Sequence, residues 1–148
     1  MKKYKLGFDV WGLLLFLVIM IPNFIWFVVP APNDILRTES VTPIVDSIGN
    51  IFQILFVSIL CMLKRKDLER LKISKLIIMT IVAVGLYYVG WVAYYIGITN
   101  PVIIILLTIP PCASFGLYAI DRKNVLALIP IIVFTFCHIV YGVGNYII

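Results

Sequence analysis

Five apolar runs, each long enough to cross the hydrocarbon core of a bilayer, occupy most of this chain. A core of about 30 Å requires about 20 helical residues. With 63% apolar and 13% charged residues, the chain departs from soluble domains, which average about 45–50% and about 25%. The sequence therefore predicts a single all-α transmembrane domain over residues 1–148. Its five spans are placed at residues 8–29, 43–63, 75–97, 101–120 and 125–147.

The continuous form of these runs favours helices over strands. Strands of a transmembrane barrel alternate apolar and polar residues, and lipid-exposed backbone must satisfy its own hydrogen bonds. Thr42 before Pro43 and Asn100 before Pro101 are typical of a helix start, with an N-cap followed by proline. The charged segment KRKDLERLK after the second run predicts a short surface helix or a solvated turn.

The basic residues predict the orientation of the bundle. Eleven of the twelve lie before the first run, between the second and third, or between the fourth and fifth, and Arg37 alone lies on the other side. Because Lys and Arg collect in cytoplasmic loops, the amino terminus is expected inside and the carboxyl terminus outside. Anionic headgroups at the inner surface then account for the net charge of +5. The lipid bilayer is the expected partner, and nucleic acid is not needed.

Polar and aromatic side chains gather in the predicted outer half, whereas the inner halves of the runs are almost entirely apolar. On the second run, Asp46, Asn50 and Gln53 are spaced i, i+4, i+7 and so share one helix face. Two further stripes lie at the same depth: His138, Tyr141 and Asn145 on the fifth run, and Tyr87, Trp91 and Tyr94 on the third. A polar group left unsatisfied in lipid is costly. We therefore expect one cavity, open outward and closed inward, as a ligand-binding site. Its expected residues are Asn23, Asp46, Asn50, Gln53, Tyr87, Trp91, Tyr94, His138, Tyr141 and Asn145.

Each of these features also has a purely structural interpretation. Asp46 lies in the first turn of a predicted helix, where the helix dipole favours a carboxylate. One interhelical hydrogen bond would satisfy a neutral His138, and Asn50 is of a type that commonly joins helices. Pro22 and the pair Pro110–Pro111 predict bends that free backbone carbonyls. Such carbonyls either bind a ligand or are satisfied by neighbouring side chains or water.

The chain lacks the familiar motifs of catalysis and cofactor binding. It contains no G-x-S-x-G, H-E-x-x-H, Walker or dinucleotide-binding sequence. A single histidine cannot build a multi-histidine metal or haem site, and the three cysteines show no C-x-x-C spacing. We therefore expect no metal, cofactor or disulfide. The remaining chemistry is acid–base catalysis by Asp46 and His138.

Three classes of function fit these observations. The favoured one is binding or transport of a small molecule through the expected cavity. The second is an accessory, immunity or sensory subunit that acts through a membrane-protein partner or a second copy of the chain. The third is a small intramembrane enzyme that uses Asp46 and His138 as a catalytic pair.

At three short motifs, IPNFIWFVVPAPND, DSIGNIFQ and FCHIVYG, the chain resembles a family of small multispan membrane proteins of Gram-positive bacteria. In that family a proline–asparagine pair ends the first span, an Ile-Gly element opens the second, and a histidine lies in the last. The resemblance implies a multi-pass protein of the bacterial plasma membrane. It implies no activity.

Overall fold

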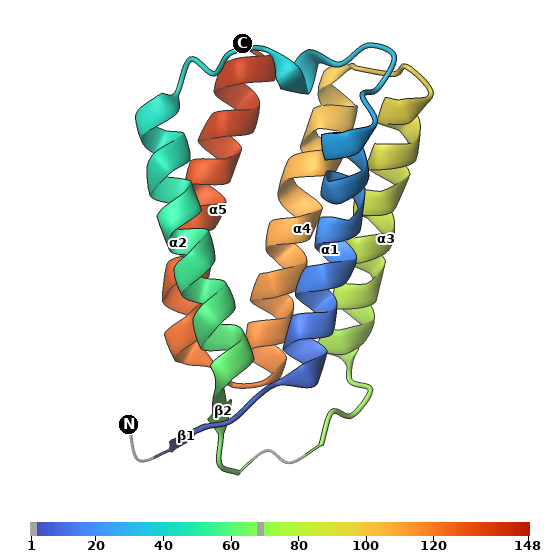
Figure 1. Cartoon of the computed structure of the whole chain (residues 1–148). Coiled ribbons are helices and arrows are strands. Elements are labelled where there is room, and N and C mark those ends of the chain that lie inside the picture. Colours follow the sequence, from blue (N-terminus) through green and yellow to red (C-terminus); the bar gives the residue numbers. More distant parts are fainter. Residues whose placement is uncertain (1–2, 68–69) are drawn as a thin grey trace.

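The computed structural model describes residues 3–67 and 70–148, and within these residues it contains five long helices (Figure 1). All five are long and apolar enough to cross a membrane. Each helix end lies within two residues of the predicted one. The helices are α1 (Val10–Val28), α2 (Pro43–Met62), α3 (Lys75–Tyr95), α4 (Pro101–Asp121) and α5 (Val125–Tyr146).

The helix starts follow the predicted capping chemistry in one case and depart from it in the other. The Asn100 side chain accepts a hydrogen bond from the backbone N–H of Ile103, with Pro101 at the first helical position, as predicted. Thr42 takes the N-cap position of α2, but its side chain caps no backbone N–H. Its hydroxyl instead donates to the carboxylate of Asp46 at 2.8 Å.

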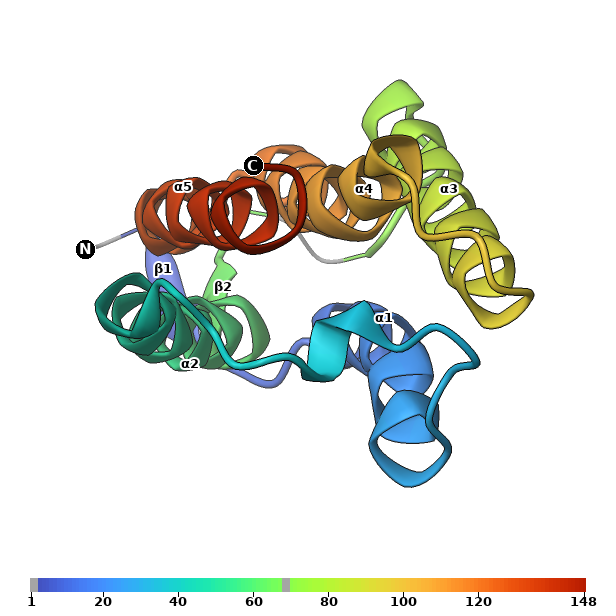
Figure 2. The same ribbon diagram turned by 90° about the horizontal axis from the view of Figure 1, so that it is seen from above.

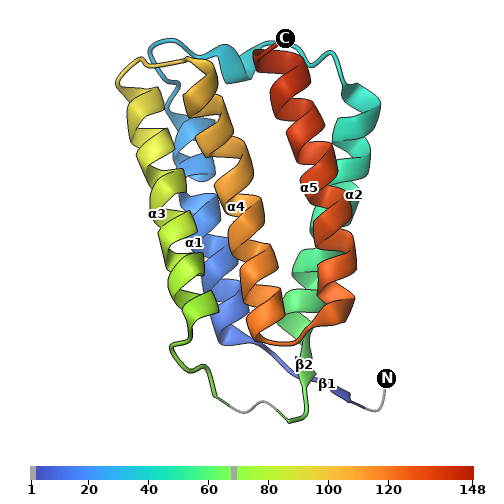
Figure 3. The same cartoon turned by 180° about the vertical axis from the view of Figure 1, so that it is seen from behind.

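The helices form two layers when seen along their axes (Figure 2). The helices α3, α4 and α5 lie in one layer, with α4 in the middle, and α1 and α2 lie in the other (Figures 2 and 3). The helix α2 packs against α5, and α4 packs against both α3 and α5. Consequently the polar stripes of α2 and α5 belong to neighbouring helices.

One end of the bundle, the sheet end, carries a two-stranded sheet that the sequence did not predict. Strand β1 (Tyr4–Leu6) pairs antiparallel with β2 (Leu63–Arg65). The prediction of a short surface helix or a solvated turn in KRKDLERLK is therefore wrong for Lys64 and Arg65, which lie in β2, whereas residues 66–67 form a turn. Backbone hydrogen bonds to a distant segment hold β2, and no local side-chain pattern signals them. Residues 68–69 of the same motif lie outside the described residues.

Asp9, which is buried, joins three helices at the sheet end. Its carboxylate accepts hydrogen bonds from the backbone N–H of Gly12 at 3.2 Å and from the hydroxyl of Tyr118 at 2.8 Å. Its own backbone N–H donates to the carbonyl of Cys61 at 2.6 Å. Asp9 thus caps α1 and ties it to α4 and to the end of α2.

Replacing Tyr118 with phenylalanine is expected to lower the free energy of unfolding by about 1 kcal/mol, because one buried hydrogen bond is lost. The measurement is thermal unfolding of the purified protein in detergent. In a double-mutant cycle with Asp9→Ala, the two losses should not add, since both variants remove the same bond. Fully additive losses would show that Tyr118 and Asp9 act separately.

The opposite end, the loop end, carries residues 29–42 with a short 3-10 helix, η1 (Ile35–Arg37). The carboxylate of Asp34 holds this segment. It accepts hydrogen bonds from Trp26 Nε1 at 2.8 Å, the Tyr94 hydroxyl at 2.7 Å, Arg37 Nε at 2.6 Å and the Ala31 N–H at 3.3 Å. The Arg37 guanidinium also lies 4.5 Å from the centre of the Trp26 ring. Asp34 therefore connects the loop to α1 and α3.

Because of these contacts, the loop end is expected to lose stability at acidic pH. Burial raises the pKa of Asp34, but hydrogen bonds from Trp26, Tyr94, Arg37 and Ala31 outweigh it and hold the pKa below the ordinary 3.8. A carboxyl group whose pKa is lower in the folded state stabilises the fold at pH values above its unfolded-state pKa. This stabilisation is lost as the pH falls through its folded-state pKa. Thermal midpoints of the wild type and Asp34→Asn, measured between about pH 6 and about pH 3, should therefore converge at the acidic end. A constant difference would show that the charge of Asp34 does not matter.

Candidate functional site

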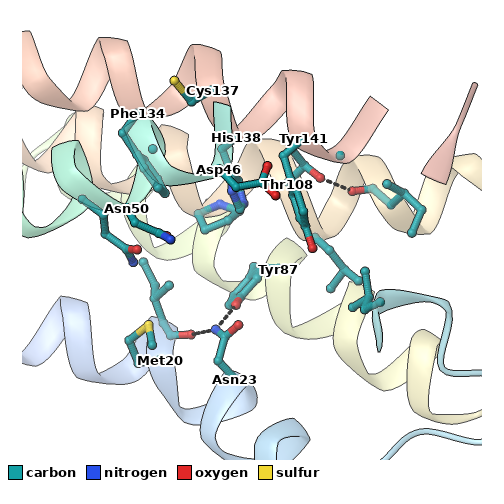
Figure 4. Close-up of a pocket in the computed structure, with 18 of the residues that line it drawn as sticks. Met20, Asn23, Asp46, Asn50, Tyr87, Thr108, Phe134, Cys137, His138 and Tyr141 are labelled. Carbon is teal, nitrogen blue, oxygen red and sulfur yellow. Dashed lines mark hydrogen bonds between the residues drawn. The ribbon is translucent and has the colours of Figure 1, made fainter. Parts of the chain in front are cut away.

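A cavity of about 440 Å³ lies between the two helix layers, in the half of the bundle nearer the loop end (Figure 4). All five helices contribute to its wall, and Leu36 of η1 joins them. Its volume falls within the range of about 300–1,000 Å³ that is typical of ligand pockets.

Eight of the ten predicted site residues lie on this wall: Asn23, Asp46, Asn50, Gln53, Tyr87, Trp91, His138 and Tyr141. Tyr94 and Asn145 do not. The buried Tyr94 hydroxyl bonds Asp34 and the Leu36 N–H. The Asn145 side chain bonds the hydroxyl of Thr42 and the N–H of Val41. For these two the expectation of a shared cavity is wrong, because both side chains are engaged by the loop segment, whose path helical periodicity does not describe.

Asp46 is held by hydroxyl groups from the start of its own helix. Its carboxylate accepts from Ser40 at 2.5 Å and from Thr42 at 2.8 Å. Among the described residues, neither Lys nor Arg lies within ion-pair distance of it, and it makes no hydrogen bond to His138. The carboxylate therefore stands on the cavity wall without a counter-charge.

Three further polar side chains of the wall, Asn50, Gln53 and His138, make no hydrogen bond to any described residue. The His138 ring instead stacks between Phe134 and Tyr141, with centroid separations of 5.1 and 6.2 Å. These side chains have hydrogen-bonding capacity that the protein does not use, and that capacity is available to a molecule in the cavity.

Trp91 adds a fourth unused group on the α3 side of the cavity. Its indole N–H is buried and has no acceptor in hydrogen-bond geometry among the described residues. The Tyr87 hydroxyl is close enough to interact with it, but this hydroxyl accepts its well-formed bond, at 2.7 Å, from the Asn23 amide. The Trp91 ring thus lines the cavity while its N–H stays buried without an acceptor.

Aromatic side chains close the cavity towards the sheet end. Phe56, which is fully buried, packs against Phe115 and Phe134, with ring centroids 4.9 and 5.2 Å away. At the loop end, the Tyr141 and Tyr146 hydroxyls are 2.6 Å apart, and Tyr146 donates to the carbonyl of Leu36 at 3.4 Å. The loop end is therefore partly covered, whereas the sequence predicted a cavity open outward.

The cavity is not fully enclosed by the protein at α2. The segments that begin α1 and end α2 meet at the sheet end, where the Gly7 N–H donates to the Met62 carbonyl and the Asp9 N–H to that of Cys61. The backbones of the two helices separate towards the loop end (Figures 1 and 2). Asn50 of α2 lines the cavity and is nevertheless exposed. A molecule in the cavity can therefore be reached at Asn50.

Several lining residues were not predicted from the sequence, among them Trp26, Leu36, Thr108 and Tyr146. Trp26 lies three residues after Asn23, so helical spacing from that residue would have found it. Thr108 belongs to α4, whose apolar residues show no separate polar stripe. Leu36 lies in the loop, and only the tertiary structure brings it to the cavity.

The carbonyl freed by Pro22 has a structural partner. Pro22 cannot donate to the carbonyl of Val18, and the hydroxyl of Tyr88 donates to it at 2.5 Å. This bond favours the packing interpretation for the first bend. In α4, Ser114 donates to the carbonyl of Pro111 at 2.7 Å, and Pro111 lines the cavity.

The described part of the chain contains no group of three or more His, Cys, Asp or Glu that could hold a metal ion. The three cysteines, Cys61, Cys112 and Cys137, are buried and free. Of these, only Cys137 lines the cavity. The polar groups that the wall offers to a ligand are therefore carboxylate, amide, imidazole, hydroxyl and thiol groups.

Comparisons with protein-family models, with curated proteins and with solved structures find no match for this chain. The resemblance to a Gram-positive family stays a prediction. The function is therefore inferred from the chemistry of the cavity itself.

Proposed function

We propose that this chain is a multi-pass membrane protein that binds a small organic molecule in the cavity, as a binding protein or a transporter. The observation that carries the proposal is the set of unpartnered polar side chains on the wall, Asn50, Gln53 and His138. Polar groups without partners are costly in an apolar bundle, and those found there commonly serve a ligand or an ion. At about 30 Å³ per water, the volume holds about fifteen water molecules or a ligand of that size.

The charge distribution supports the proposed orientation in a plasma membrane. Lys5, Lys64, Arg65 and other basic residues lie at the sheet end, and Arg37 lies at the loop end. The amino and carboxyl ends lie at opposite ends of the bundle (Figure 1). By the preference of Lys and Arg for the cytoplasmic side, the sheet end faces the cytoplasm and the cavity lies in the outer leaflet.

The two alternative functions have less support. Catalysis by Asp46 and His138 would favour a direct interaction between them, but Asp46 bonds Ser40 and Thr42, and His138 stacks on aromatic rings. No helix face stands out as a docking surface for a membrane-protein partner or a second copy of the chain. Every helix exposes apolar residues, and such residues are equally suited to contact lipid. Both stay predictions from the sequence.

Native mass spectrometry of the protein released from lipid nanodiscs tests the proposal. The wild type is expected to retain a small molecule at about one per chain. His138→Phe keeps a ring of similar shape and removes both nitrogens, and Asn50→Leu removes the amide, so both should retain less. Ser58→Ala is the matched control, because Ser58 is exposed outside the cavity and bonds only its own helix. Equal retention in all four proteins would contradict binding in this cavity.

A further inference from the structure

The cavity wall carries charge of one sign. Asp46 is the one carboxylate among the lining residues, and neither Lys nor Arg is among them. A carboxylate has about four acceptor positions, and the Ser40 and Thr42 hydroxyls use two of them. The wall therefore presents a negative charge with free acceptor capacity, and an anionic ligand would be repelled without compensation.

Aromatic rings make up much of the remaining wall. They come from α1, α3, α4 and α5, so they surround the cavity from both layers. The faces of such rings attract cations, and groups of them are a common way to hold quaternary ammonium groups. The lining rings are Trp26, Tyr87, Trp91, Phe115, Phe134, Tyr141 and Tyr146.

The exposed surface of the two helices adds a requirement for an apolar part of the ligand. Close in sequence to the lining residues Asn50 and Asn23, α2 exposes Ile51 and Ile54, and α1 exposes Ile21 and Phe24. In the proposed orientation, exposed apolar side chains of these helices face hydrocarbon. A ligand that reaches the cavity from the bilayer must therefore carry an apolar segment that is soluble in lipid.

We infer that the cavity binds amphiphilic organic cations, with an ammonium group near Asp46 and the aromatic wall and with an apolar chain directed towards the lipid. This inference rests on the proposed function and names its ligand class. Neutral amphiphiles can use Asn50, Gln53 and His138, but they gain nothing from the charge of Asp46. Anionic amphiphiles find no lining cation to offset their charge.

Three probes with one tail and different heads test the inference: octyltrimethylammonium, octyl glucoside and octanesulfonate. Their binding is measured by calorimetry on protein in an uncharged polyoxyethylene detergent, because such a detergent has no ammonium group that would compete with the cationic probe and no charge that would concentrate one probe. Saturable binding of octyltrimethylammonium is expected, at least about tenfold tighter than that of octyl glucoside. Octanesulfonate should show no saturable binding.

Asp46→Asn is expected to weaken binding of octyltrimethylammonium by about ten- to a hundredfold, the range for loss of one contact to a charged group. Binding of octyl glucoside should change less than about threefold. Glu39→Gln is the matched control, since Glu39 is an exposed acid of the same loop segment outside the cavity. It should leave both affinities unchanged, which excludes a general effect of surface charge.

The outcomes separate this inference from the proposed function. Saturable binding of octyl glucoside without a preference for the cation would overturn the inference and leave a binding cavity in place. Equal cation affinity in the wild type and a folded Asp46→Asn would also overturn it. If Asp46→Asn does not fold, the order of the three probes on the wild type decides. Absence of saturable binding for all three, together with equal retention in the mass-spectrometry test, would remove both proposals.

Discussion

Replacing Asp34 with alanine is expected to lower the free energy of unfolding by about 3 kcal/mol. The carboxylate accepts four hydrogen bonds, and its side chain is only 11% exposed. A hydrogen bond to a charged group contributes about 1.5–3 kcal/mol, less where water can replace it. The loss also leaves the hydroxyl of the fully buried Tyr94 without its acceptor. Thermal and denaturant unfolding of the purified protein measure the effect.

Two variants of the same segment serve as controls. Asp34→Asn keeps one acceptor oxygen and the side-chain shape, so it should lose less stability than Asp34→Ala. Glu39→Ala removes an exposed acid and should change stability by less than about 0.5 kcal/mol. An equal loss for Asp34→Ala and Glu39→Ala would show that the Asp34 contacts do not hold the loop.

The Asp34 variants also connect the loop to the cavity. Tyr94 bonds both Asp34 and the backbone N–H of Leu36, and Leu36 lines the cavity. Loss of Asp34 should therefore loosen the partly covered loop end. In the mass-spectrometry test, Asp34→Ala is expected to retain less small molecule than Glu39→Ala.

Gly142→Ala is expected to cost about 2 kcal/mol of stability through a clash between α5 and α4. A Cβ atom at Gly142 would lie 2.6 Å from Oγ1 and 3.2 Å from Cγ2 of Thr108. Thr108 is buried and its hydroxyl donates to the carbonyl of Ile104 at 2.6 Å, so its side chain cannot move freely. Overpacking of this kind typically costs about 1–3 kcal/mol.

The double variant and a second glycine test this explanation. Thr108→Ala removes both atoms that the new methyl group would meet, so it should rescue most of the stability lost in Gly142→Ala. Gly116→Ala on α4 meets nothing within 4 Å, and alanine favours a helix over glycine by about 0.5–1 kcal/mol. It should therefore be neutral or stabilising. Equal losses in Gly116→Ala and Gly142→Ala would point to a general intolerance of α4 and α5.

The sequence alone was sufficient for the five helices and for most of the residues that share the cavity. Helix length follows from the thickness that an apolar run must cross, and a local period of 3.6 residues decides which side chains share a face. This is why Asp46, Asn50 and Gln53 could be grouped on α2 before its neighbours were known. The same reasoning grouped His138 with Tyr141 on α5.

The tertiary structure alone decided which faces meet and where the chain departs from its helices. Most helix faces are apolar here, on the surface of the bundle as well as inside it, so hydrophobicity does not distinguish a buried face from an exposed one. Tyr94 and Asn145 left their predicted stripe because residues of the 29–42 loop bind them. Asp9 acquired its partner Tyr118 from more than a hundred residues away. Such contacts depend on which helices are neighbours in the bundle. The local sequence period shows which residues share a helix face, but it does not show which helix packs against that face.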